Sequence, residues 1–189
     1  PVAFDLALHL GTLLAVFAYF RDDILEIAAG FFTFDWRNAG FRTAILVVVA
    51  MVPTAVIGFA FKGFFESMFY SAFLVGVALI VTGTVLFLAS KAKAGNKEIG
   101  VFESAVIGVA QGIAVAPGIS RSGSTISAAM LLGVPAERAA RFSFLLGIPA
   151  ILGASAIEIA GQQAELSAIP VLSLLAGVAA AALVGYWSI

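Results

Sequence analysis

The sequence predicts an all-α membrane protein that crosses the bilayer several times, and three observations lead to that prediction. Hydrophobic residues make up 62% of the 189 residues and charged residues 11%, and the mean hydropathy is +1.11. Soluble globular chains contain about 45–50% apolar and about 25% charged residues. The apolar residues also gather in runs of roughly 20, the length of a membrane-spanning helix. One water-soluble domain of this length could not bury so much apolar surface.

The charge and the residue inventory exclude several other classes of protein. A net charge of −1 argues against a nucleic-acid partner, which would require a basic stripe. Without cysteine the chain has no disulfide framework and no thiolate chemistry. The single histidine, His9, cannot form a multi-histidine metal site and is interpreted as a hydrogen-bonded structural residue.

Five apolar runs have the length of a full span. They are Val2–Phe20, Thr43–Phe61, Ser71–Ser90, Phe142–Ala160 and Ile169–Ile189. Pro53 lies inside the second run, where a kink is tolerated if neighbouring helices satisfy the freed carbonyl. The polar connector Arg21–Arg42 contains aromatic residues suited to headgroup depth, and Lys62–Tyr70 is expected to be a short loop.

The stretch from 101 to 134 differs from these spans because it is broken in its middle by Pro117-Gly118. Its two halves, Val101–Ala116 and Ser122–Val134, are each shorter than the roughly 20 residues that cross a bilayer. We therefore expect two half-helices that enter and leave the membrane on one side. The whole chain, residues 1–189, is predicted to be a single integral membrane domain that contains this re-entrant hairpin.

The distribution of basic residues leads to the same hairpin. The connector Arg21–Arg42 and the loop Lys91–Glu98 hold six of the ten Lys and Arg, so both are expected in the cytoplasm. The loop Gly161–Ala168 has none and is expected outside. The fourth span must then begin in the cytoplasm, at Arg138 and Arg141. The segment between the cytoplasmic loop Lys91–Glu98 and Arg138 therefore cannot cross the membrane.

The turn of the hairpin is rich in hydrogen-bond donors. Ser120 is a plausible N-cap for the second half-helix, whose first N–H groups lack helical partners. A helix N-terminus favours anions, and the guanidinium of Arg121 suits bidentate phosphate binding. We therefore expect a compact anion such as a phosphate. The candidate catalytic residues are Ser120, Arg121 and Ser122; the candidate substrate-binding residues are Gln111, Gly118, Gly123, Ser124 and Thr125; no metal ligand is predicted.

Structural alternatives exist for most of these residues. Serine and threonine in membrane helices often serve close packing alone, and Gly76, Gly83 and Gly108 are interpreted as packing glycines. Gln111 could form an interhelical hydrogen bond or line the site. Arg121 differs, because an intramembrane arginine costs at least about 2.5–3.5 kcal/mol and is functional by default. An ion pair would need an acidic neighbour, and none lies within fifteen residues of it in sequence.

The turn and its approach resemble the undecaprenyl-pyrophosphate phosphatase family, the bacitracin-resistance membrane proteins of bacterial cell-wall synthesis. The matching motifs are the G-x-x-Q segment Gly108–Gln111, the PG-x-SRSG-x-T run Pro117–Thr125, the His9–Thr12 segment of the first span, and Phe142–Leu146 with Pro149. The resemblance implies hydrolysis of a C55 polyprenyl pyrophosphate to the monophosphate, in a bacterial plasma membrane. It also implies two inverted repeats, each with a re-entrant hairpin.

The family's second motif, EG-x-x-EFLP-x-SSTGH, is not found in this sequence. Because the chain starts and stops inside apolar runs, we expect both ends to be cuts within a larger protein, and this piece alone to be inactive. The glutamates of the missing motif would bind a divalent cation, Mg²⁺ or Ca²⁺, or position the nucleophile. The expected partners are the polyprenyl pyrophosphate and the bilayer, a homodimer is left open, and no nucleic acid is expected.

A function of another class remains open beside hydrolysis. Half-helix N-termini hold anionic substrates in several secondary transporters, so the chain could be a transporter or flippase of an anionic lipid or small anion. An ion channel is a weaker alternative, because a single arginine at one turn makes a poor selectivity filter. Paired glutamates and a histidine on a second hairpin would indicate hydrolysis.

Overall fold

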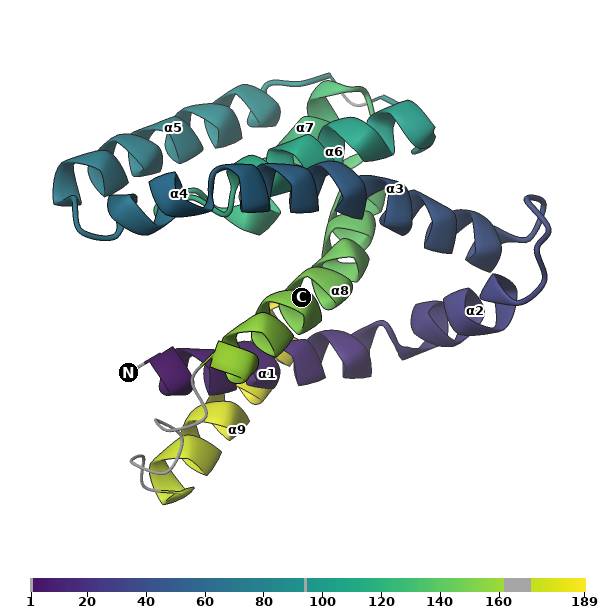
Figure 1. The fold of residues 1–189 in the computed structure, drawn as a ribbon. Coiled ribbons are helices and arrows are strands. Elements are labelled where there is room, and N and C mark those ends of the chain that lie inside the picture. Colours follow the sequence, from purple (N-terminus) through teal and green to yellow (C-terminus); the bar gives the residue numbers. More distant parts are fainter. Residues whose placement is uncertain (1, 94, 162–170) are drawn as a thin grey trace.

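The computed structural model describes residues 2–93, 95–161 and 171–189, and the regular structure in these ranges is entirely helical (Figure 1). The helices are α1 (Val2–Tyr19), α2 (Arg21–Phe31), α3 (Ala39–Ala60), α4 (Lys62–Met68), α5 (Ala72–Ser90), α6 (Val101–Ile113), α7 (Arg121–Leu131), α8 (Ala136–Gly161) and α9 (Val171–Ser188). This confirms the predicted all-α fold of a polytopic membrane protein.

Each predicted span is a helix. Within the described ranges, α3, α5 and the part of α8 up to Ala156 are long and apolar enough to cross a bilayer. In α1 and α9 the apolar segments Leu8–Tyr19 and Ser173–Ser188 occupy the predicted first and fifth spans. The outer loop was predicted at Gly161–Ala168, and its residues after Gly161 lie outside the described residues.

Two segments predicted as connectors contain helices, and tertiary packing explains the difference. The connector after α1 forms α2, whose Ile24 and Ile27 pack against a buried cluster that includes Phe20. The predicted loop before α5 forms α4, which buries Phe65 and Met68. In both segments these apolar residues pack against neighbouring helices, and a short helix stabilised by such packing needs no strong propensity of its own.

The hairpin of α6 and α7 lies between α3 and α5, and α8 leads from it toward α1 and α9 (Figure 1). Helix α6 packs closely along α3, and α7 contacts both α5 and α8. With a rise of about 1.5 Å per residue, neither half-helix reaches across a hydrocarbon core of about 30 Å. The structure therefore contains the predicted helix–turn–helix, and its re-entry into the membrane stays a prediction.

Small residues bring the backbones of α3 and α6 together. A Cβ atom at Gly108 would overlap the carbonyl oxygen of Ala50, so Gly108 is a packing glycine as predicted. Thr54 Oγ1 donates to Gly108 O at 2.9 Å across the same seam. The prediction is wrong for Gly76 and Gly83, because a Cβ atom at either would meet no described atom within 4 Å.

The charged segments gather at one end of the molecule. Arg42 pairs with Glu98 at 2.9 Å, Arg138 donates to Asn96, and Arg141 pairs with Asp23; these contacts join the connector after α1, the loop before α6 and the start of α8. Both ends of the hairpin lie here too, because Lys97 N–H donates to Gly133 O at 3.1 Å. The structure thus brings these charged segments and the two ends of the hairpin together, and their place on the cytoplasmic side of the membrane stays a prediction.

Candidate phosphate-binding turn

A tight turn joins α6 to α7. Ile119 N–H donates to Ala116 O at 3.1 Å, and Gly118 has a φ of +90°, a conformation that only glycine adopts without strain. A Cβ atom at Gly118 would also stand 2.7 Å from the carbonyl oxygen of Val75 in α5. Gly118 therefore lets the chain reverse in direct contact with a membrane-spanning helix.

The N-terminus of α7 is capped as predicted. Ser120 is extended, its Oγ accepts from Gly123 N–H at 3.1 Å, and its carbonyl accepts from Ser124 N–H at 2.9 Å. The N–H groups of Arg121 and Ser122 precede these bonds and have no helical partner. They and the helix dipole leave a partial positive charge at the turn.

Thr82 of α5 forms two hydrogen bonds with the backbone of the turn. Its Oγ1 donates to Gly118 O at 3.0 Å and accepts from Ser120 N–H at 3.2 Å. One hydroxyl thereby satisfies a carbonyl and an N–H that lie two residues apart in the turn. Nothing in the local sequence of α5 indicates this role, because the partners lie 36 and 38 residues further along the chain.

Thr125 is tied to the body of the protein. It is 1% exposed, and its Oγ1 lies 2.6 Å from Ser143 Oγ in α8 and within 3.1 Å of the carbonyl oxygens of Arg121 and Ser122. These contacts connect the first turn of α7 to α8. Its predicted substrate contact stays a prediction, and in this structure its hydroxyl links the two helices.

Arg121 is half-buried, and its guanidinium lies against Gly147 of α8, where a Cβ atom would come 3.4 Å from Nη2. Within the described part of the chain no carboxylate, carbonyl or hydroxyl accepts a hydrogen bond from this guanidinium. A half-buried cation in an apolar protein is costly without an anionic or polar partner. Among the described residues the guanidinium of Arg121 therefore has no hydrogen-bond partner, and its predicted contact with substrate stays a prediction.

Ser122 and Ser124 follow Arg121 in the first turn of α7. Ser122 is exposed and Ser124 is half-buried, and neither hydroxyl has a hydrogen-bond partner among the described residues. Arg121, Ser122 and Ser124 thus share the first turn of α7, and each has a side-chain donor without a partner among the described residues. Their predicted contact with an anion stays a prediction.

The side chain of Gln111 faces α3. It is 2% exposed, its Nε2 donates to Thr54 Oγ1 at 3.4 Å, and its Oε1 has no partner among the described atoms. Of the two interpretations of this residue, the structure shows the interhelical hydrogen bond. A contact with substrate remains a prediction.

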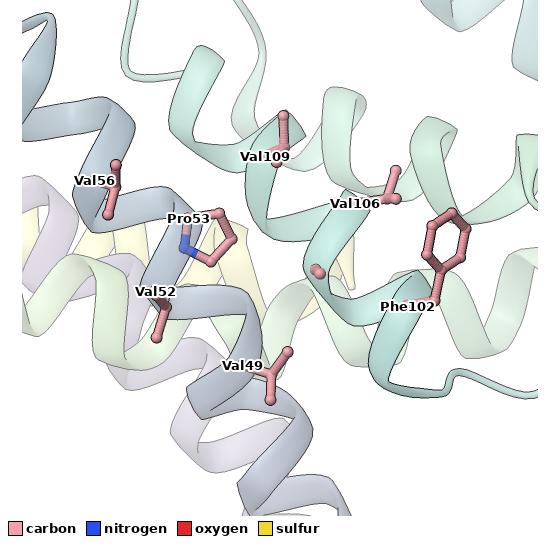
Figure 2. A pocket seen from close by; sticks show the side chains of 8 residues that line it. Val49, Val52, Pro53, Val56, Phe102, Val106 and Val109 are labelled. Carbon is pink, nitrogen blue, oxygen red and sulfur yellow. The ribbon is translucent and has the colours of Figure 1, made fainter.

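An apolar groove of about 610 Å³ runs between α3 and α6 (Figure 2). It is lined by Val49, Val52, Pro53, Val56, Phe102, Ala105, Val106 and Val109. Because these side chains carry no donor, the groove cannot hold a phosphate. In the described ranges no three His, Asp or Glu side chains lie close enough together to hold a metal ion.

The membrane-spanning helices and the donor-rich turn between α6 and α7 define a polytopic α-helical membrane protein that contains a helical hairpin. The sequence profile of the bacitracin resistance protein BacA family matches residues 1–189, and the chain belongs to that family. The protein named undecaprenyl-diphosphatase from Carboxydothermus hydrogenoformans is 42% identical over 192 residues, covering 98% of this chain and 70% of that protein. Proteins of the same name from Syntrophotalea carbinolica and Methanosphaera stadtmanae are 42% and 38% identical and cover 94% and 100% of the chain.

Proposed function

We propose that the protein hydrolyses undecaprenyl diphosphate to the monophosphate and so recycles the lipid carrier of cell-wall synthesis. The names of the relatives support this activity. The structural observation that supports it most is the guanidinium of Arg121, which stands without an acceptor among the described residues at the N-terminus of α7. A diphosphate supplies the oxygen atoms that such a donor set lacks.

The net reaction adds water across the phosphoric anhydride. A P–O bond forms at the terminal phosphorus, the bond to the bridging oxygen breaks, and inorganic phosphate and the lipid monophosphate result. Negative charge spreads over the phosphoryl oxygens in the transition state, so donors fixed beforehand lower the barrier. In this proposal Arg121 binds two oxygens with its planar guanidinium, and the free N–H groups of α7 bind others.

The serines around Arg121 have different parts in this proposal. The hydroxyl groups of Ser122 and Ser124 donate hydrogen bonds to oxygen atoms of the diphosphate. The Oγ of Ser120 accepts from Gly123 N–H, so its own hydrogen remains a donor on the side of the ligand. In this proposal Gly118 and Gly123 keep the shape of the turn that binds the diphosphate, since a Cβ atom at Gly123 would come 2.8 Å from the capping Ser120 Oγ and one at Gly118 would come 2.7 Å from Val75 O.

A divalent cation does not fit the residues of this turn. Mg²⁺ and Ca²⁺ prefer carboxylate and carbonyl oxygens, whereas the turn offers a guanidinium, hydroxyl groups and N–H groups. No divalent cation is therefore assigned to this turn. A cation such as the one the family resemblance implies would need carboxylates from outside the turn.

Reconstitution distinguishes hydrolysis from transport. The intact protein is incorporated into vesicles that contain undecaprenyl diphosphate, and released phosphate and lipid monophosphate are measured together with movement of the lipid between leaflets. Hydrolysis requires phosphate release well above that of protein-free vesicles, with one monophosphate formed per phosphate. Movement of intact diphosphate without phosphate release would overturn the proposal in favour of a transporter.

A further inference from the structure

We propose that Thr82 of α5 is a positioning residue for phosphoryl transfer, which it serves by holding the turn that presents Arg121. The inference rests on the proposed function, because it concerns the same site. Thr82 lies on a separate helix from Arg121, and among the described residues its hydroxyl is hydrogen-bonded to Gly118 and Ser120 and not to Arg121. Its effect on the reaction is therefore expected through the backbone of the turn.

The two hydrogen bonds of Thr82 fix the orientation of both peptide groups that flank Ile119. Its hydroxyl donates to Gly118 O at 3.0 Å and accepts from Ser120 N–H at 3.2 Å. Ser120 immediately precedes Arg121 and caps α7, so a rotation of its peptide group would redirect the first N–H groups of the helix. A single side chain thus determines where the donors of the turn point.

Thr82 belongs to a continuous face of α5 that follows the turn. Val75 O and Ala78 Cβ would meet a side chain at Gly118, and Leu86 Cδ2 would meet one at Gly123 at 3.2 Å. Positions 75, 78, 82 and 86 are spaced by three or four residues and therefore lie on one side of the helix. Thr82 is the hydroxyl-bearing position of this face, and the apolar contacts on either side hold it against the turn.

Removal of the hydroxyl would leave Gly118 O and Ser120 N–H without their partner. Because the turn lies in protein at membrane depth in the predicted topology, the two groups would have to find new partners by rotation. A displacement of about 1 Å in a catalytic group can reduce the rate about 100-fold. Donors of the turn act most strongly on the charge that develops in the transition state, so we expect the loss in kcat to exceed the change in KM.

The test compares Thr82→Val, which keeps the shape and removes the hydroxyl, with Thr82→Ser, which keeps the hydroxyl. Thr84→Val is the matched control, because Thr84 is exposed on the same helix and its hydroxyl bonds only to Ile80 O in its own helix. Hydrolysis of undecaprenyl diphosphate and thermal unfolding in detergent are measured on the intact protein. Thr82→Val should lower kcat about 10- to 100-fold, with KM changed less than about threefold.

Thr82→Ser and Thr84→Val should retain kcat within about threefold of the unmodified protein. If Thr82→Val does not fold, Thr82→Ala replaces it in the same comparisons, and a lower kcat than that of Thr84→Val is again expected because alanine also lacks the hydroxyl. Equal kcat for Thr82→Val and Thr84→Val, or equal losses for Thr82→Ser and Thr82→Val, would overturn the positioning role. Absence of hydrolysis by the unmodified protein would instead reject the proposed function.

Discussion

The guanidinium of Arg121 in α7 rests against Gly147 of α8, and a Cβ atom at Gly147 would stand 3.4 Å from Nη2. Two residues 26 positions apart thus determine where the positive charge lies. The absence of a side chain on α8 provides the space for the guanidinium, and Ser143, one turn earlier, fixes α7 to the same helix through Thr125. The donor site is therefore built from three helices: α5, α7 and α8.

Replacement of Arg121 should abolish most of the activity. Arg121→Ala removes a donor that is strongest in the transition state, and the expected loss is at least about 10²–10³ in rate. Arg121→Lys should retain only a little activity, because an ammonium lacks the planar pair of donors. Both variants should fold, since no described acidic group pairs with Arg121 and would be left unpaired. Phosphate release and detergent thermal unfolding measure the two effects, and near-normal turnover by the lysine variant would reject bidentate binding.

A large side chain at Gly147 should displace the guanidinium of Arg121. We expect Gly147→Leu to lower kcat by at least about tenfold, while Gly147→Ala is tolerated because its Cβ makes an ordinary contact. Gly153→Leu serves as control, since a Cβ atom at Gly153 in the same helix meets no described atom within 4 Å. Equal activity of the two leucine variants in the phosphate-release assay would contradict the placement of Arg121.

Gly108 and Gly76 should respond oppositely to alanine. At Gly108 a methyl group would overlap Ala50 O, so Gly108→Ala should push α6 from α3 and destabilise the protein by about 1–3 kcal/mol. At Gly76 the space is open, and Gly76→Ala should be neutral or stabilising by up to about 1 kcal/mol because alanine has the higher helix propensity. Thermal unfolding in one detergent compares them. A lower melting temperature for Gly76→Ala than for Gly108→Ala would contradict the packing.

The topology predicts which positions are reached from each side of the membrane. The chain has no cysteine, so single substitutions provide unambiguous labelling sites. Arg37→Cys and Lys93→Cys should react with an impermeant maleimide only from the cytoplasmic side, and Gln163→Cys, which lies outside the described residues, only from the other side. Labelling of positions 93 and 163 from the same side would show that α6 and α7 do not form a re-entrant hairpin.

Features that depend on residues close together in the chain could be predicted from the sequence alone. Apolar runs predicted the helices because each must satisfy its own backbone in a bilayer. Pro117 and Gly118 predicted the break, and Ser120 predicted the cap, because a capping hydroxyl reaches an N–H only three residues away. The charge distribution predicted that the hairpin begins and ends on one side.

Contacts between residues from distant parts of the chain became visible only in the folded structure. Thr82 and Gly147 were not predicted, because nothing near them in sequence indicates that α5 and α8 dock on the turn. Gly76 and Gly108 look alike as sequence, yet only Gly108 lies where two backbones meet. For the same reason the sequence allows two interpretations of Gln111, since its hydrogen bond depends on which side of α6 faces Thr54. Hydrogen bonds between near neighbours and the periodicity of apolar residues can be predicted from one segment of the sequence. The packing of one helix on another depends on the surfaces of both helices together.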